Sequence, residues 1–473
     1  MISKRSIDLF HRAAQGIKGY KDFLAENDCD PADIKTPKDY QDIPVTGKNN
    51  YLTAYTLFDL VWEEELRQTL LFCSTSGSTG EPYYFPRSEE LSRQYSILIE
   101  NYLNQHKKGK TLVIIGFGMG VWIGGVITLR AFEIASERAK IPLSILPTGY
   151  NETEILKALK KLAPGFDQTI LVGYPPFIKE VVDDARRKKI QLSELNIRFI
   201  FAAEAFTETF RDYVCNKAGV GNPLLDTLNI YGTADIGAMA YETPLSILIR
   251  RLSGKNQKLY KSIFGQIEKT PTLAQYDPEF IEFEQVDDEI LLTGNSVLPL
   301  IRYAIGDNGG VITYRQMSDI FADNGKDLDK EIKKAGIGKF VKKQPFIFVY
   351  ERKDFSISLH GLNIYPEFVK EALLDKRLVD DVTERFTMIT RFDRGQNQYL
   401  EINLELQAGV VPTVELEALA HKIITRKLRE KSSEFAEISK TKNSEKLLSV
   451  AFWPNRHPRY FKPGIKQKWV GKE

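Results

Sequence analysis

The chain has 473 residues, of which 42% are apolar and 27% are charged, the balance of an ordinary soluble enzyme of two or three domains. Its 65 basic and 63 acidic side chains nearly cancel, so neither nucleic acid nor a membrane is predicted as a partner. Cys29, Cys73 and Cys215 lie far apart and form no CxxC pair, which argues against a disulfide scaffold or a cysteine-built zinc site and favours a cytoplasmic location.

Residues 1–68 are predicted to begin with a helix and to continue as a loop. Ile7, Phe10 and Ala14 recur at the spacing that places apolar side chains on one helix face. No unbroken apolar segment with a cleavage site accompanies them, so no signal peptide is predicted.

The stretch from residue 71 to 86 reads LFCSTSGSTGEPYYFP. Its apolar start predicts a buried strand that breaks abruptly into serine, threonine and glycine. The glycines allow left-handed backbone angles, so successive N–H groups can converge on one anion, and the hydroxyls add hydrogen bonds. A polyphosphate suits such a loop, although composition alone also fits a solvated turn, and no Walker sequence occurs. The residues predicted to bind phosphate are Ser76, Gly77, Ser78, Thr79 and Gly80.

Residues 111–129 carry no charge and approach the length of a membrane span. Glycines interrupt this segment and its first part is rich in strand-forming residues, which favours a buried strand, a glycine turn and a buried helix over a membrane span. The glycines do not have the GxGxxG spacing, so no dinucleotide site is predicted.

Strand-like and helix-like segments alternate from residue 141 to 230, which predicts a parallel sheet covered by helices. Ligands of such sheets bind at the carboxyl ends of the strands. Three short strings fall at these ends, namely residues 173–176, 202–206 and 231–235.

A charge-rich segment, residues 318–343, separates the last of these motifs from the tail of the chain. The tail has its own strand patterns, at residues 385–389 and 399–406, and its own helix patterns, at residues 365–374 and 414–431. We therefore predict an α/β fold, in which residues 1–352 form a large domain of helix-covered, mostly parallel sheets and residues 353–473 form a small α+β domain.

Four strings follow the serine-rich loop in order, AAEAFTE (202–208), NIYGTAD (229–235), LIRYAIGD (300–307) and RKDFSISLHGLNIYP (352–366). Together with STSGSTGEP they resemble the motifs of adenylate-forming enzymes, the superfamily of acyl-CoA synthetases, luciferases and peptide-synthetase adenylation domains. The resemblance covers essentially the whole chain and is nearest to phenylacetate-CoA ligase-like proteins.

This resemblance implies which residues of the large domain surround a nucleotide. The backbone at Ala203 and Glu204 would flank adenine. Tyr231, followed by Gly232, would stack on the same base. The Asp307 carboxylate would accept hydrogen bonds from both ribose hydroxyls.

The resemblance also implies the metal and the catalytic groups. Thr233 would contact phosphate, and Asp235 would hold Mg2+. Asp235 stands where glutamate is usual, and its shorter side chain favours contact with the metal through water. Arg302 is assigned to catalysis together with Thr233 and a lysine of the small domain, Lys466.

The small domain is implied to be mobile. In the resembling family it swings about a hinge, here Asp354, and carries a lysine to the phosphates. Lys466, which follows Gly464 after one inserted residue, is the nearest match to the family's Gly-Lys pair, and Lys462 and Lys468 are the alternatives.

Trp122 and Tyr174 are predicted to line the pocket for the acid, with helix-on-sheet packing as the alternative for Trp122. Tyr83, Ala304 and Glu351 depart from the family's usual residues, Tyr83 in the phosphate loop, Ala304 near the ribose motif and Glu351 before the hinge.

The sequence thus predicts an ATP-dependent enzyme that converts a carboxylic acid into an acyl-adenylate and passes the acyl group to a thiol, foremost coenzyme A. ATP, Mg2+ and coenzyme A are the predicted cofactors, and a homodimer is left open. One alternative transfers the acyl group to an acyl carrier protein or an amine. A second alternative is a degenerate nucleotide-binding protein without turnover, because Asp235 and Tyr83 depart from the family pattern.

Overall fold

The chain forms two compact units in the computed structural model. The residues that it describes are 2–69, 71–74, 83–105, 109–120, 123–140, 142–265, 271–352, 357–373, 375–441, 447–458, 460–461 and 470. Of these, the residues within Met1–Ser74, Tyr84–Gly173 and Val181–Lys353 form unit 1, and those within Thr75–Tyr83, Tyr174–Glu180 and Asp354–Glu473 form unit 2.

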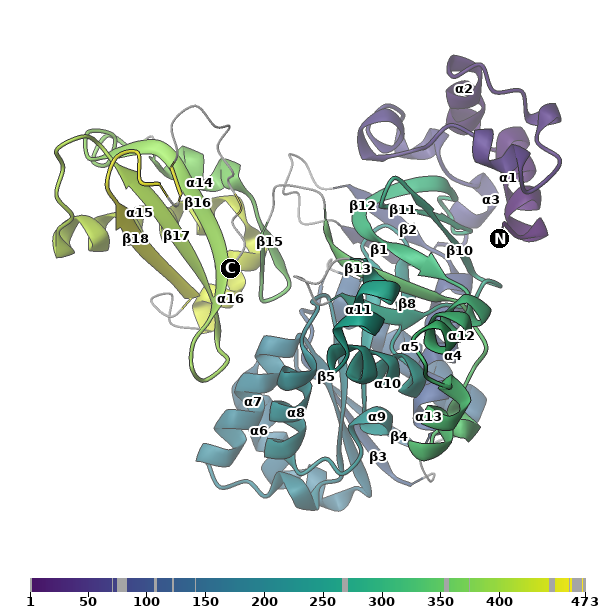
Figure 1. Cartoon of the computed structure of the whole chain (residues 1–473), viewed down its shortest axis with the longest axis horizontal. Coiled ribbons are helices and arrows are strands. Elements are labelled where there is room, and N and C mark those ends of the chain that lie inside the picture. Colours follow the sequence, from purple (N-terminus) through teal and green to yellow (C-terminus); the bar gives the residue numbers. More distant parts are fainter. Residues whose placement is uncertain are drawn as a thin grey trace. The chain divides into compact units, whose positions relative to one another are not determined.

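Unit 1 is organised around an 11-stranded sheet (Figure 1). In spatial order its strands are β10 (Ile281–Val286), β11 (Glu289–Gly294), β12 (Leu300–Ile312), β13 (Phe346–Arg352), β9 (Thr272–Gln275), β8 (Gly237–Tyr241), β7 (Thr227–Thr233), β6 (Ile197–Ala202), β5 (Gln168–Gly173), β3 (Thr111–Ile115) and β4 (Leu143–Pro147). The strands from β7 to β4 pair in parallel, and the pairs from β10 to β7 are antiparallel. A separate antiparallel hairpin consists of β1 (Leu71–Ser74) and β2 (Tyr84–Arg87).

The helices that precede residue 353 are α1 (Lys4–Gly16), α2 (Lys18–Glu26), α3 (Glu63–Leu66), α4 (Glu89–Leu103), α5 (Ile123–Ala139), α6 (Glu152–Lys161), α7 (Pro175–Arg187), α8 (Glu208–Ala218), α9 (Pro223–Asp226), α10 (Pro244–Gly254), α11 (Gln257–Phe264), α12 (Tyr314–Asp323) and α13 (Leu328–Lys334). Of these, α5 to α9 connect the successive parallel strands β3 to β7 (Figure 1). Short 3-10 turns are η1 (Pro31–Asp33), η2 (Asp39–Asp42), η4 (Leu57–Asp59), η5 (Ala163–Gly165), η6 (Leu192–Glu194) and η7 (Gly338–Phe340), and η3 (Lys48–Leu52) is a π-helical turn.

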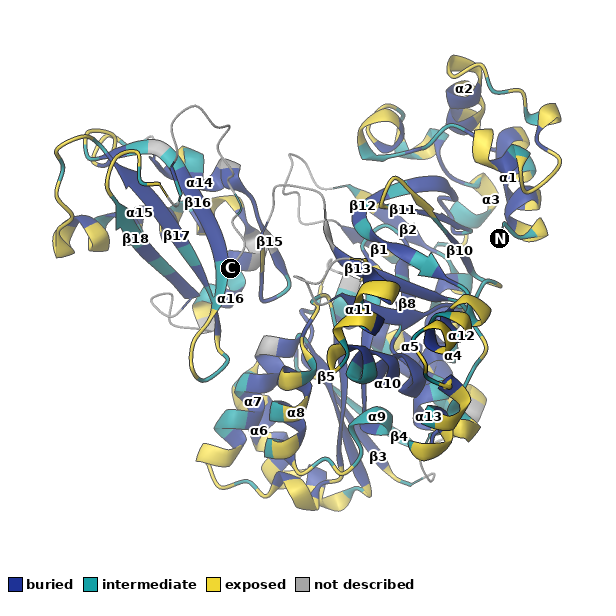
Figure 2. Cartoon of the chain, in the orientation of Figure 1, coloured by how far each residue is buried: buried dark blue, intermediate teal, exposed yellow. Residues whose placement is uncertain are grey.

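The inner parallel strands β3 and β5 are buried along their whole length, as expected for strands covered by helices on both faces, whereas the edge strand β4 is partly exposed. The inner strands are dark blue in Figure 2, whereas the outer turns of the flanking helices are yellow. Local sequence also marks where these helices begin and end. Thr207 caps the N-terminus of α8 through a side chain that accepts a hydrogen bond from the Phe210 N–H, and Gly219 caps its C-terminus with a φ of +75°.

The uncharged segment 111–129 forms the buried strand β3 and the start of α5, as predicted. Within the described part of the chain, no helix has the length and apolar character needed to cross a membrane. The amphipathic N-terminal helix is confirmed as α1, in which Ile7, Phe10 and Ala14 are buried.

The charge-rich segment 318–343 is folded into unit 1. Met317 and Phe321 of α12 and Leu328 and Ile332 of α13 are buried in one hydrophobic cluster. The chain then returns to the sheet as β13, which inserts between β12 and β9.

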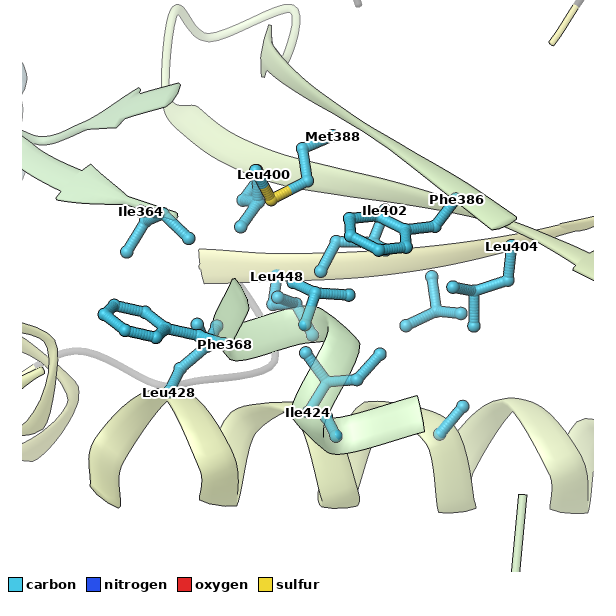
Figure 3. Close-up of a cluster of buried hydrophobic side chains, with 14 of the residues drawn as sticks. Ile364, Phe368, Phe386, Met388, Leu400, Ile402, Leu404, Ile424, Leu428 and Leu448 are labelled. Atoms are coloured by element: carbon cyan, nitrogen blue, oxygen red, sulfur yellow. The ribbon is translucent and has the colours of Figure 1, made fainter. Parts of the chain in front are cut away.

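Unit 2 is an α+β structure with a three-stranded sheet. Its strands are β16 (Val382–Phe392), β17 (Gln398–Leu406) and β18 (Leu448–Trp453), with a hairpin of β14 (Ile357–Leu359) and β15 (Leu362–Ile364) and the helices α14 (Pro366–Leu373), α15 (Val414–Lys431) and α16 (Ser433–Thr441). In Figure 3, Met388 and Ile402, which are register partners on β16 and β17, lie over Ile424 and Leu428 of α15. This shared apolar core confirms the predicted fold class, a large helix-covered α/β part followed by a small α+β part.

Candidate functional site

Polar groups gather where the parallel strands of unit 1 end. Strand β6 ends at Ala202 and leads into the turn 202–206, and β7 ends at Thr233 and leads into the tight turn before β8. Because the carboxyl ends of parallel strands meet at one edge of a sheet, this edge is the expected ligand site of an α/β fold.

Tyr231 and Asp307 meet at this site although 76 positions separate them in the sequence. The Tyr231 hydroxyl donates a hydrogen bond of 2.6 Å to Oδ2 of Asp307. Asp307 lies on β12 and is buried, and its register partner on β13 is Arg352. The structure therefore brings together the two residues that the resemblance assigns to the base and to the ribose of one nucleotide.

Side chains of β7 and α10 donate hydrogen bonds to backbone carbonyls of the turn 202–206. Ala203 adopts a left-handed conformation, with a φ of +76°. Asn229 of β7 donates from Nδ2 to the Glu204 carbonyl at 2.9 Å, and Arg250 of α10 donates to the Phe206 carbonyl. These contacts fix the backbone that is predicted to flank adenine.

A buried cluster of charges lies beneath the same turn. Nη2 of Arg211 lies 2.8 Å from Oε2 of Glu242, and Nη1 of Arg250 lies 2.5 Å from Oε1 of the same carboxylate. Nε of Arg211 also contacts Glu208 at 3.0 Å. The Arg211 guanidinium lies over the ring of Phe206, 4.8 Å from its centroid. The cluster therefore contacts the turn through both the side chain and the carbonyl of Phe206.

Burial and neighbouring charges have opposite effects on the pKa of Glu208 in this cluster. Burial by itself would raise the pKa of Glu208, but the guanidinium groups of Arg211, Arg250 and Arg251 hold that pKa below its usual value. Sequence reasoning missed the cluster. Its members come from α8, α10 and the residue that follows β8. Only Glu208 and Arg211 are related by a local spacing, i and i+3 on α8, and no local pattern relates them to Glu242 or Arg250.

The turn between β7 and β8 contains Thr233, Ala234 and Asp235. A Cβ on Gly232 would lie 2.6 Å from the Gly237 carbonyl oxygen, so the two strands approach too closely there for any other residue. Oγ1 of Thr233 is buried and has no hydrogen-bond partner in the described structure. Its hydroxyl is thus a candidate ligand for an incoming acceptor such as a phosphate oxygen.

Arg302 lies on β12, and its side chain points into the N-terminal region of unit 1. Nη1 donates to the carbonyl of Gln41 at 2.5 Å and also to the carbonyl of Ile43, and Nε lies 3.3 Å from Oε1 of Glu284. These contacts anchor the segment 41–43 to the sheet. Its predicted catalytic role stays a prediction, because none of these partners is one of the other predicted site residues.

Several predicted site residues lie outside the described residues. They are Ser76, Gly77, Ser78, Thr79, Gly80, Trp122, Asp354 and Lys466, with the alternatives Lys462 and Lys468. Tyr174 is described, as part of unit 2, and its carbonyl accepts a hydrogen bond from the Ile178 N–H at the start of α7.

Among the described residues, no group of three or more histidine, cysteine, aspartate or glutamate side chains is arranged to hold a metal ion. Asp235 therefore offers a single carboxylate at the β7–β8 turn. Mg2+ in nucleotide sites is usually bound by one or two carboxylates together with substrate phosphates, and the metal-binding role of Asp235 stays a prediction.

Comparison with known proteins gives no match to a protein-family model and no match to a curated protein sequence. Among solved structures, the chain is similar to 2-hydroxyisobutyryl-CoA ligase in complex with 2-HIB-AMP and CoA in the thioesterification state, with a TM-score of 0.65 and 14% identity, over 99% of this chain and 88% of that one. An open conformation of the same ligase has a TM-score of 0.55 and 14% identity, over 99% of this chain and 90% of that one. At this identity the likeness shows that the two proteins share a fold, and it extends over nearly the whole chain.

Proposed function

We propose that the protein is an AMP-forming ligase of the adenylate-forming superfamily that joins a carboxylic acid to a thiol, with coenzyme A as the first candidate acceptor. The observation that carries this proposal is the 2.6 Å hydrogen bond between Tyr231 and Asp307. The sequence resemblance assigns these residues to adenine and ribose of one nucleotide, and their contact supports that assignment. The shared fold with a CoA ligase supports the same function.

The first half-reaction joins the acid to the α-phosphate of ATP and releases pyrophosphate. A carboxylate must approach a polyphosphate of the same charge, so the site has to neutralise negative charge more than it has to supply covalent chemistry. Mg2+, when bound, would supply part of this neutralisation through Asp235. Thr233 and the loop 76–80 would add hydrogen bonds to the phosphates.

In the second half-reaction, the thiol attacks the acyl carbon of the adenylate, and AMP leaves. The residues around the nucleotide act here by keeping AMP in place as a leaving group. Tyr231 and Asp307 would hold the nucleoside, and the turn 202–206 would flank the base through its backbone, which Asn229 and Arg250 keep in place.

A panel of carboxylic acids tests the proposal. With ATP and Mg2+ present, the correct acid is expected to give acid-dependent pyrophosphate release, and addition of coenzyme A is expected to give a thioester. Adenylation without a thioester would direct the search to amines and carrier proteins as acceptors. ATP binding without pyrophosphate release by any acid would indicate a nucleotide-binding protein without turnover.

Removal of the Asp307 carboxylate is expected to weaken ATP binding. Two charge-assisted hydrogen bonds of about 1.5–3 kcal/mol each would be lost in Asp307→Ala, so the affinity for ATP should fall at least about tenfold in calorimetric titration. Tyr231→Phe is the matched control, because it breaks the Tyr231–Asp307 bond and keeps both the ring and the carboxylate. Equal ATP affinities of Asp307→Ala and the unaltered protein would remove Asp307 from the nucleotide site.

A further inference from the structure

Arg87, the last residue of β2, carries a positive charge that no carboxylate of the described residues balances. The residue is only 7% exposed. Its Nη2 donates to the carbonyl of Ala234, in the turn between β7 and β8. Nε and Nη1 are buried and have no hydrogen-bond partner in the described part of the chain.

The other buried arginines of the described structure all have a carboxylate partner. The four pairs are Arg198 with Asp226 at 3.4 Å, Arg211 with Glu242 at 2.8 Å, Arg250 with Glu242 at 2.5 Å and Arg302 with Glu284 at 3.3 Å. Burial of an ion is costly unless an opposite charge repays it, and these four arginines follow that rule. Arg87 is the exception, so its charge requires another explanation.

The electrostatic surroundings of Arg87 agree with its geometry. Burial lowers the pKa of Arg87 below its usual value, and the nearby side chains of Cys73 and Asp235 only oppose this shift. The thiol of Cys73 is a weak hydrogen-bond acceptor and the Asp235 carboxylate attracts the guanidinium, but burial outweighs both effects. An additional anion beside Arg87 would therefore be bound favourably.

The position of Arg87 indicates which anion this is. Arg87 lies at the end of β2, where it pairs in register with Leu71 of β1. The Ala234 carbonyl that Arg87 contacts lies between Thr233 and Asp235, and Oγ1 of Thr233 is buried without a hydrogen-bond partner in the described structure. Arg87 thus lies against the turn that is predicted to contact the phosphates of ATP.

We propose that Arg87 is a further anion-binding residue of the nucleotide site, whose charge is balanced by the β- and γ-phosphates of ATP and by the pyrophosphate that they become. This assignment rests on the proposed function. It explains why an arginine is buried here without an acidic partner: the partner is the polyphosphate, which is present only in the ligand-bound protein.

Titrations with ATP and with AMP, both in the presence of Mg2+, test the assignment. Arg87→Gln removes the charge and keeps an N–H donor for the Ala234 carbonyl. We expect its ATP affinity to fall about tenfold or more and its AMP affinity to change less than about twofold, because AMP lacks the phosphates that Arg87 would bind. Arg87→Lys keeps the charge and should retain most of the preference for ATP.

Arg198→Gln is the matched control, since Arg198 is as buried as Arg87 but already has a carboxylate partner. Its ratio of ATP to AMP affinity should equal that of the unaltered protein. An unchanged ratio in Arg87→Gln, or an equal loss for both nucleotides, would overturn the assignment of Arg87. If the unaltered protein binds neither nucleotide, the proposed function fails as well, which separates the two failures. Should Arg87→Gln not fold, Arg87→Met also removes the charge and provides the same comparison. An undiminished AMP affinity together with a weaker ATP affinity would support the assignment, and an unchanged ratio of the two affinities would overturn it.

Discussion

Glu242→Leu is expected to lower the free energy of unfolding by about 3–5 kcal/mol, because it removes the carboxylate that two buried guanidinium groups share. Arg211 and Arg250 are both almost fully buried, so water cannot replace the lost partner. Arg211 would retain Glu208, which limits the loss. Equilibrium unfolding in urea, followed by circular dichroism, measures the change.

Glu63→Leu is the matched control for this substitution. Glu63 forms an ion pair with Arg67 at 2.5 Å, but both side chains are more than 70% exposed. Exposed pairs contribute at most about 1 kcal/mol, so this variant should unfold close to the unaltered protein. A Glu242→Leu protein that is as stable as the Glu63→Leu protein would show that the buried cluster contributes no more than a surface pair.

The second large effect is expected for Lys466→Ala, in adenylation only. A lysine beside the α-phosphate would oppose the negative charge that develops there, and loss of one such group costs about 10²–10³-fold in rate. We therefore expect acid-dependent pyrophosphate release to fall by that factor. Conversion of pre-formed acyl-AMP and coenzyme A into thioester should continue, because the resemblance implies that the lysine is withdrawn in the second half-reaction.

The neighbouring lysines and the hinge provide the controls for this prediction. Lys462→Ala and Lys468→Ala should leave adenylation unchanged, and Asp354→Pro should impair thioester formation instead, since proline restricts the hinge torsion. A defect in Lys462→Ala or Lys468→Ala in place of Lys466→Ala would move the catalytic role to that lysine. Normal adenylation by all three variants would contradict the domain movement itself.

Secondary structure was largely predictable because its signals are local. The alternation of apolar and polar residues marked β17, and the helical repeat marked α15, whose predicted ends at Val414 and Lys431 agree with the structure. The same patterns identified the alternating strands and helices between residues 141 and 230 and hence the parallel half of the sheet. Side-chain periodicity and capping are set by residues within one or two turns, so no tertiary information was needed.

The candidate site residues were also predictable in part, because the motifs that contain them occur along the chain in the order that the resembling family has. Tyr231 and Asp307 were selected from separate motifs, and the structure places them in contact. The antiparallel half of the sheet was not predicted. Strand β13 inserts between β12 and β9, and nothing local in the segment 346–352 specifies which strands will receive it.

By itself, the sequence determined which segments become helices and strands and which motifs are available for a nucleotide. Only the tertiary structure decided which charges are shared. Glu242 forms ion pairs with both Arg211 and Arg250, and Arg302 contacts Glu284 and the N-terminal loop. Nε and Nη1 of Arg87 have no hydrogen-bond partner among the described residues. An ion pair depends on distances of a few ångströms between residues that are 31 positions apart for Arg211 and Glu242 and 85 positions apart for Arg5 and Glu90. Burial decides its energy, so neither quantity is encoded in a local pattern.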